Sequence, residues 1–169
     1  AERLGLPELG RVMGWGASCD AAHITAPDAS GIHLAEAIRR ALEAGRCPAS
    51  GLAGIVGHGT GTVYNDAAEL AGLSRALGET EGGPLFSLKG AVGHTLGATG
   101  VLQLIAGLLA VKAGTWPGAA CLPAADTVMP EAAGRLGRAA RPVTGRRFLS
   151  IAIGFGGLNN VLLAEGGRP

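Results

Sequence analysis

The stretch "LAGIVGHGTGTVYNDAAELAGLSRALG", residues 52–78, decides the fold class. Its first five residues are small or apolar, which is typical of a short buried strand. A glycine-rich loop follows, and residues 65–78 have the pattern of a helix, with Asn65 as the expected N-cap and Gly78 as the stop. A strand, a polar loop and a helix in this order are the unit of layered α/β folds.

The same alternation continues in both directions along the chain. The sequence predicts strands at 10–18 and 83–90, helices at 30–45 and 97–114, an edge segment at 116–122 and an irregular connection at 123–147. The last stretch, "RFLSIAIGFGGLNNVLLAEG" at 147–166, predicts two antiparallel strands joined by a turn. The helix at 97–114 is apolar on nearly every side, so we expect it to be buried. Together these elements predict a single α/β domain with one mixed, mostly five-stranded sheet covered by helices.

Composition narrows the function classes. The 169 residues are 47% hydrophobic and 16% charged, with a net charge of +1, which does not favour a nucleic-acid partner. The longest apolar run is short and interrupted by glycine, which argues against a membrane span. Three widely spaced cysteines favour neither a disulfide framework nor a zinc site, so a reducing cytoplasm is the expected compartment. The opening "AERLGLPELG" leads almost at once into a strand, and we expect this to be the later part of a longer protein.

Two histidines lie in glycine-rich loops that each follow a predicted strand and precede a predicted helix. His58 belongs to "GHGTGTVYND", and His94 to "KGAVGHTLGATG" together with Lys89. Ligands of open α/β sheets bind at this end of the strands. Each histidine could instead brace its own loop, and a metal site built from His58, His94 and Asp66 is an alternative without the usual ligand spacing. Neither loop has the ending of a phosphate-binding loop, and the chain has no GxSxG elbow of a serine hydrolase.

Three motifs in order resemble the C-terminal half of a β-ketoacyl-acyl carrier protein synthase, a condensing enzyme with the thiolase fold. They are "HGTGTVYNDAAE" at 58–69, "KGAVGHTLGATG" at 89–100 and "GFGGLNN" at 154–160. The opening "GWGASCDAAHITAPD" is also similar to the stretch that precedes them in the family, so the resemblance covers nearly all of residues 1–169.

The resemblance implies catalytic roles for His58, His94 and Lys89 and a substrate gate at Phe155. It implies decarboxylative Claisen condensation of an acyl thioester with malonyl-carrier protein, in which the two histidines stabilise an enolate. No cofactor or metal is implied, because the substrates are carried on the phosphopantetheine of an acyl carrier protein. Residues of the same motifs are expected to support the loops: Thr60, Thr62, Asp66, Glu69, Gly156, Gly157 and Asn159.

The chain also departs from the family pattern. The family's nucleophilic cysteine belongs to an N-terminal half that this sequence does not contain, and we expect Cys19, Cys47 and Cys121 to be structural. Gln103 stands where the family has a glutamate that partners the motif lysine. The run Ile151–Ile153 replaces a more polar family segment. These differences indicate a divergent synthase.

Three functions are compatible with these features. The first is the C-terminal half of a ketosynthase, completed by an N-terminal half and working as a homodimer or heterodimer with an acyl carrier protein. The second is a non-catalytic subunit that resembles a chain-length factor; retention of His58, Lys89 and His94 favours the first. The third is an acyl- or carrier-binding module without chemistry, in which a group of arginines contacts an acidic carrier protein or a pantetheine phosphate. The arginines in question are Arg135, Arg138, Arg141, Arg146 and Arg147.

Overall fold

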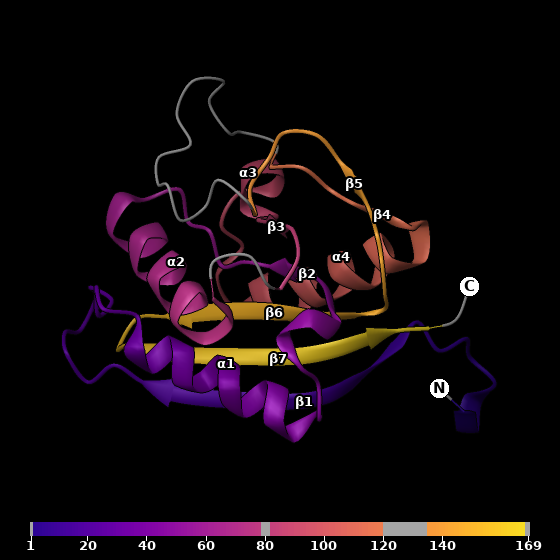
Figure 1. Ribbon diagram of the computed structural model, residues 1–169, viewed down its shortest axis with the longest axis horizontal. Coiled ribbons are helices and arrows are strands. Elements are labelled where there is room, and N and C mark those ends of the chain that lie inside the picture. The colour runs from indigo at the N-terminus through magenta and orange to yellow at the C-terminus, as the bar shows by residue number, and fades with distance from the viewer. Residues whose placement is uncertain (1, 79–81, 120–134, 168–169) are drawn as a thin grey trace.

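A computed structural model describes residues 2–78, 82–119 and 135–167 of the chain (Figure 1). Its main sheet has five strands in the order β1-β7-β6-β2-β3. The strands are β1 (Gly10–Cys19), β2 (Leu52–Val56), β3 (Leu85–Phe86), β6 (Arg147–Gly154) and β7 (Leu158–Gly166). The helices are α1 (Ile32–Ala44), α2 (Val63–Leu77), α3 (Lys89–Val92) and α4 (Thr99–Ala113), with short 3-10 turns at Glu2–Leu4, Ala49–Gly51 and Leu96–Ala98.

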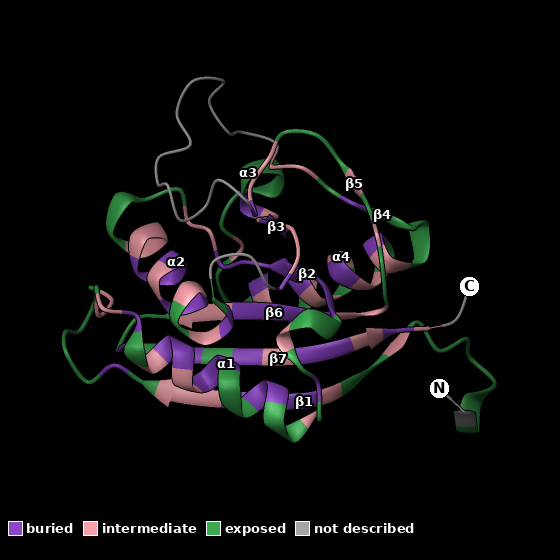
Figure 2. Cartoon of the chain, viewed as in Figure 1, coloured by how far each residue is buried: buried purple, intermediate pink, exposed green. Residues whose placement is uncertain are grey.

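The sheet is mixed, as the sequence predicted. Strand β2 is parallel to β3 and to β6, whereas β7 is antiparallel to both β6 and β1. Helices α1 and α2 cover one face, and α4 covers the other. Alternate residues of β6 supply the two cores, because successive side chains of a strand point to opposite faces. Leu149 and Ile151 pack toward α1 and α2, and Phe148 packs toward α4. Residues 148–151 of β6 are accordingly buried (Figure 2).

Glycines allow the layers to approach closely. A Cβ on Gly16 of β1 would lie 2.0 Å from the carbonyl oxygen of Ala37 in α1. On the other face, a Cβ on Gly107 of α4 would lie 2.1 Å from the Phe148 ring. Since no real Cβ fits at such distances, each helix can lie this near the sheet only because a glycine occupies the contact.

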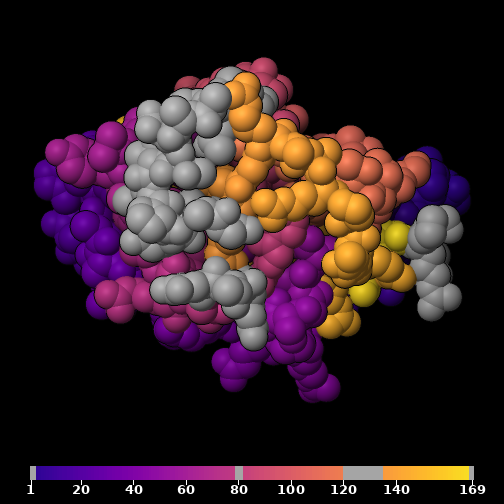
Figure 3. All heavy atoms as spheres, turned by 45° about the horizontal axis from the view of Figure 1, so that its top comes forward, coloured from indigo at the N-terminus to yellow at the C-terminus, as the bar shows by residue number. Residues whose placement is uncertain are grey.

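Several predicted boundaries are corrected. Helix α2 begins at Val63, and its N-cap is Thr62 rather than Asn65; the Asn65 amide donates to the Thr62 hydroxyl at 2.8 Å. The predicted strand at 83–90 is reduced to Leu85–Phe86, because the lysine motif enters helix α3. Most of the predicted connection at 123–147 lies outside the described residues, but its described part includes strand β5 (Arg141–Pro142), which pairs with β4 (Thr115–Trp116). In the space-filling view, the described residues from 135 onward (orange) lie beside the red-orange residues that include α4 and β4 (Figure 3).

Helix α4 is less buried than expected. Its sheet-facing side holds the buried residues Thr99, Gln103, Gly107 and Ala110. Its other side exposes Val101, Ile105 and Leu109, which recur every four residues and therefore form one stripe. By length and composition alone the stretch Leu96–Ala113 could cross a membrane, with a mean hydropathy of 1.7. Contacts of α4 with strands β2, β6 and β7 identify it as a core helix with one uncovered side.

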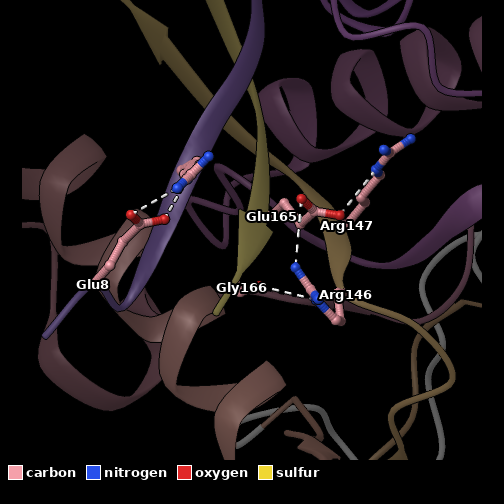
Figure 4. A network of polar contacts seen from close by, with 6 residues as sticks. Glu8, Arg146, Arg147, Glu165 and Gly166 are labelled. Carbon is pink, nitrogen blue, oxygen red and sulfur yellow. Dashed lines mark hydrogen bonds and ion pairs between the residues drawn. The ribbon is translucent and has the colours of Figure 1, made fainter. Parts of the chain in front are cut away.

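The sheet has a charged end and a loop-bearing end. At the charged end, Glu165 of β7 lies between Arg146 and Arg147, with N···O distances of 3.5 and 3.4 Å (Figure 4). Glu8 pairs with Arg11 nearby. Arg135 is 3% exposed and donates to the carbonyl of Gly78. The five arginines considered for carrier binding therefore do not all lie on the exposed surface.

Candidate active site

The loop-bearing end of the sheet collects the motif residues. Strands β2, β3 and β6 are parallel and end there at Val56, Phe86 and Gly154. His58 follows β2 by two residues, and Lys89 follows β3 by three. The turn that holds Phe155 follows β6 directly. Three motifs far apart in the sequence therefore meet at one edge, because parallel strands bring their carboxyl ends together.

His58 and His94 are direct neighbours. Their ring centroids are 5.8 Å apart, and the ring planes meet at 84°. His58 is 6% exposed, whereas His94 lies on an exposed loop between α3 and the turn at Leu96–Ala98. Two imidazoles thus face one small region from different loops.

The hydrogen bonds of the two rings select their protonated nitrogens. The backbone N–H of Leu96 donates to Nδ1 of His94 at 3.0 Å. The Nζ atom of Lys89 lies 3.2 Å from Nδ1 of His58, and an ammonium group can only donate. Since Nδ1 is the acceptor in both rings, the proton of each neutral imidazole is on Nε2. Neither Nε2 atom has a hydrogen-bond partner within residues 2–78, 82–119 and 135–167. Both are thus donors available to a substrate.

Burial keeps His58 neutral. Removal from water lowers the pKa of His58 to about 4, and the charges of Lys89 and then His94 act in the same direction. At neutral pH His58 therefore presents a neutral N–H donor rather than a charged imidazolium. A neutral donor can stabilise a developing oxyanion without having to lose a proton.

Glu69 holds the backbone around His58. Its Oε1 accepts from the backbone N–H of His58 at 2.6 Å, and its Oε2 accepts from that of Gly59 at 2.8 Å. Burial raises the pKa of Glu69, while the two backbone donors oppose the rise. Glu69 lies in the second turn of α2. Because the interaction of a carboxylate with the helix dipole is significant mainly in the first turn, that interaction contributes little here. Its two hydrogen bonds to the loop backbone therefore account for a glutamate at this position.

Lys89 links this loop to α3. Its side chain is largely buried and donates to the backbone carbonyl of His58 as well as approaching Nδ1. Burial lowers the pKa of Lys89, and the carboxylates of Glu69 and Asp66 oppose this. The charge partner that Gln103 does not offer is therefore supplied by α2.

A second polar network shapes the rest of the loop. The hydroxyls of Thr60 and Thr62 lie 2.9 Å apart, and the Asp66 carboxylate accepts from Thr60 and from the backbone N–H of Gly61. Ser87, which the sequence did not single out, donates to the carbonyl of Gly59 at 2.9 Å. These contacts fix the glycine-rich segment although it has no regular structure.

Sequence and structure comparisons identify the family. Residues 9–122 match the family described as the β-ketoacyl synthase C-terminal domain. The chain belongs to this family. It is 38% identical over 154 residues to the actinorhodin polyketide β-ketoacyl synthase 1 of Streptomyces coelicolor, covering 90% of this chain and 32% of that protein.

Solved ketosynthases share the fold. A β-ketoacyl synthase from Burkholderia phymatum STM815 superimposes with a TM-score of 0.87 at 32% identity, over 99% of this chain and 40% of that one. The ishigamide ketosynthase/chain length factor gives the same TM-score at 30% identity and the same coverages. The described domain therefore has the thiolase-like fold, and it spans about a third to two fifths of the length of these ketosynthases.

The turn of the ketosynthase domain that holds Phe155 is connected by hydrogen bonds to the loop after β1. Phe155 is 77% exposed in the turn between β6 and β7, so it is not a core aromatic. The Asn159 amide donates to Asp20 at 2.6 Å, and the backbone N–H of Asp20 donates to the carbonyl of Gly157 at 2.8 Å. A Cβ on Gly157 would lie 2.8 Å from that of Asp20, and Gly157 also has a positive φ of 74°. Sequence reasoning missed Asp20, because no local motif relates it to the distant turn.

A hollow of about 370 Å³ in the ketosynthase domain is lined by His94 and by the glycines on either side of His58. His94, Lys89, Ser87 and Glu69 contribute polar groups, and Leu70 and Leu85 contribute apolar surface. No group of three or more His, Cys, Asp or Glu side chains in the described parts of the chain is placed to hold a metal. The arrangement offers hydrogen-bond donors rather than ligands.

The cysteines lie apart from these donors. The exposed Cys19 donates through its thiol to the Gly156 carbonyl, with Sγ and O 3.3 Å apart, and Cys47 is buried in the core beside α1. Cys121 lies outside the described residues. A structural role for all three stays a prediction.

Proposed function

We propose that this domain supplies the enolate-stabilising half of a β-ketoacyl synthase active site. The observation that carries the proposal is the pair of imidazoles 5.8 Å apart, each with Nδ1 occupied as an acceptor. The two Nε2–H groups are available to the thioester oxygen of malonyl-carrier protein. When the bond between the α-carbon and the carboxylate breaks, carbon dioxide leaves and its electron pair forms an enolate whose charge rests on that oxygen. Two N–H donors at this oxygen stabilise the charge as it develops.

The second half of the reaction forms the new carbon–carbon bond. The enolate carbon attacks the carbonyl of an acyl group held as a thioester on a cysteine, and the cysteine leaves as a thiolate. We infer that the complementary N-terminal half of the synthase supplies this cysteine. The matched ketosynthases are two to three times as long as this chain, which supports the need for such a half.

The exposed side of α4 supports the same assembly. Val101, Ile105 and Leu109 form a stripe of apolar side chains facing away from the sheet. A contiguous apolar surface of this kind marks an interface. The complementary half is the proposed occupant, and an acyl carrier protein and a second synthase unit, identical or related, are the further proposed partners.

Loss of carbon dioxide from malonyl-carrier protein tests the proposal. In the assembled synthase, His94→Ala should slow decarboxylation, followed by mass spectrometry, by about 10²- to 10³-fold. His33→Ala changes a histidine of α1, the helix on the face of the sheet opposite to α4. This variant should leave the rate of decarboxylation unchanged. Equal rates for wild type and His94→Ala would contradict the enolate role.

A non-catalytic subunit is the second candidate. Gln103, which stands where the family has a glutamate, and the similarity to a ketosynthase/chain length factor structure favour it. On this alternative the domain pairs with a true synthase and supports chain elongation without reacting itself. An assembled protein that lacks decarboxylation in wild-type form, yet is required for product formation by a partner synthase, would favour this second candidate.

A further inference from the structure

We propose that Gln103 is a positioning residue for His58, and that it acts as a hydrogen-bond donor that a carboxylate could not replace. The consequence for catalysis rests on the function proposed above. The structural part of the proposal does not, because it concerns how the backbone on either side of His58 is held.

The side chain of Gln103 reaches the end of β2 from the opposite layer. Gln103 is 1% exposed on the sheet-facing side of α4, and its Nε2 donates to the carbonyl of Gly57. Gly57 is the residue between the last residue of β2 and His58. Its own N–H donates to the carbonyl of Phe86 in β3 at 2.9 Å. Gly57 is therefore fixed through its N–H by the neighbouring strand and through its carbonyl by α4.

The two peptide groups that flank His58 are fully bonded. The Gly57 carbonyl accepts from Gln103, and the His58 N–H donates to Glu69. The His58 carbonyl accepts from Lys89, and the Gly59 N–H donates to Glu69. Three helices, α4, α2 and α3, thus each hold one part of the same short backbone segment. Removing any of the three leaves a buried peptide group without its partner, which is costly and frees the segment to move.

The chemistry of the contact requires a donor. A carbonyl oxygen can only accept, whereas an ionised glutamate has no proton to give. The Gln103 amide therefore points its NH₂ group at Gly57, and its Oε1 has no hydrogen-bond partner in the described parts of the chain. A glutamate in the same place would either repel the carbonyl or keep a proton. The amide is the side chain of this shape that donates at every pH.

The groups around this contact set how a glutamate would titrate. On its strand side α4 meets the apolar residues Val56, Phe148 and Trp116, which carry no charge. The titratable groups of the His58 segment are Glu69 from α2, Lys89 from α3 and the two imidazoles. Burial and the neighbouring carboxylate of Glu69 disfavour an ionised carboxylate at position 103, whereas the ammonium group of Lys89 favours it. We expect the first two effects to prevail, so that the pKa of a glutamate at this position is raised in the folded protein. Gln103→Glu should accordingly regain the hydrogen bond at low pH and lose it at high pH.

Two variants of nearly the same size separate donation from packing. In the assembled synthase, Gln103→Met removes the donor at every pH and should lower kcat for decarboxylation by about 10- to 100-fold, with KM little changed. Gln103→Glu should match Gln103→Met at pH 8 and approach wild type as the pH falls toward 5, each rate being divided by that of wild type at the same pH. Leu104→Met, the next residue of α4, controls for a change of packing and should remain near the wild-type rate.

Hydrogen–deuterium exchange provides a readout that does not depend on activity. Peptides that cover residues 57–61 should exchange faster in Gln103→Met at all pH values, and faster in Gln103→Glu only at high pH. Unchanged exchange in both variants, or a Gln103→Glu variant that equals wild type at pH 8, would overturn the proposal. If wild type shows no decarboxylation while the exchange pattern appears, the proposed function fails and the positioning role of Gln103 stands.

Discussion

Lys89 contacts His58 twice: its Nζ lies 3.2 Å from Nδ1 of the ring and also donates to the backbone carbonyl of the same residue. One side chain thus fixes both the ring orientation and the tautomer of the histidine. The positive charge also makes a second proton on the ring unfavourable. Lys89 therefore acts on His58 electrostatically and geometrically at once.

Replacing the lysine should reveal this electrostatic link. In Lys89→Met the pKa of His58 should rise from about 4 toward its ordinary value, because burial remains but the neighbouring charge is lost. The histidine ring resonances in NMR titrations of the assembled protein measure this pKa. Lys112→Met changes the chain's only other lysine, which is exposed on α4, and should leave the His58 pKa unchanged. A His58 pKa that is unaltered in Lys89→Met would show that the charge of Lys89 does not contribute to it.

His58 should make stability depend on pH below neutrality. Its folded pKa of about 4 is below the unfolded value near 6.5, so the unfolded chain binds more protons between these values. The stabilising contribution is complete above pH 6.5 and is lost as the pH falls toward 4. The free energy of unfolding of wild type relative to His58→Gln should then decrease by roughly 3 kcal/mol over this range. Denaturant titrations at several pH values measure the difference, and a flat difference would contradict the depressed pKa.

Glu69→Gln should loosen the loop that carries His58. A glutamine can accept with one oxygen, but its NH₂ group would oppose the second backbone N–H, leaving one buried donor without a partner. The free energy of unfolding should fall by about 1–3 kcal/mol. Glu43→Gln, an exposed glutamate of α1, is the matched control and should change it little. Equal unfolding transitions for the two variants would argue against the bracing role of Glu69.

A charge on the exposed stripe of α4 should prevent assembly. Ile105→Asp places a carboxylate in the middle of the apolar row of Val101 and Leu109, where the complementary half is proposed to pack. Size-exclusion chromatography of the two halves should show loss of the complex, whereas Lys112→Asp on an exposed position of α4 should retain it. A complex of normal size and stability with Ile105→Asp would place the interface elsewhere.

Local sequence patterns predicted most of the helices and strands of the fold. The hairpin of β6 and β7, the helices α1 and α4 and the buried strand β2 agree with the sequence-based prediction to within two residues. Each has a strong periodicity or an apolar run with a clear glycine stop. The predicted start of α2 was wrong because Thr62, three residues before the predicted N-cap Asn65, already has the N-cap conformation. The strand at 83–90 is shorter than predicted because "KGAV" forms a helical turn. The glycine in this stretch does not favour a helix, so the sequence pattern did not predict one.

The sequence by itself determined which residues of the candidate site have chemistry to offer. Two histidines and a lysine in glycine-rich loops, each after a strand, could be read directly, and so could their resemblance to ketosynthase motifs. Only the tertiary structure decided what those residues do to one another. The exposed side of α4, the hydrogen bonds of Glu69 and Gln103 to the His58 segment, and the tie between Asp20 and Asn159 join parts of the chain far apart in sequence or different layers of the fold. Such contacts follow from how the helices pack on the sheet, and local periodicity carries no information about that packing.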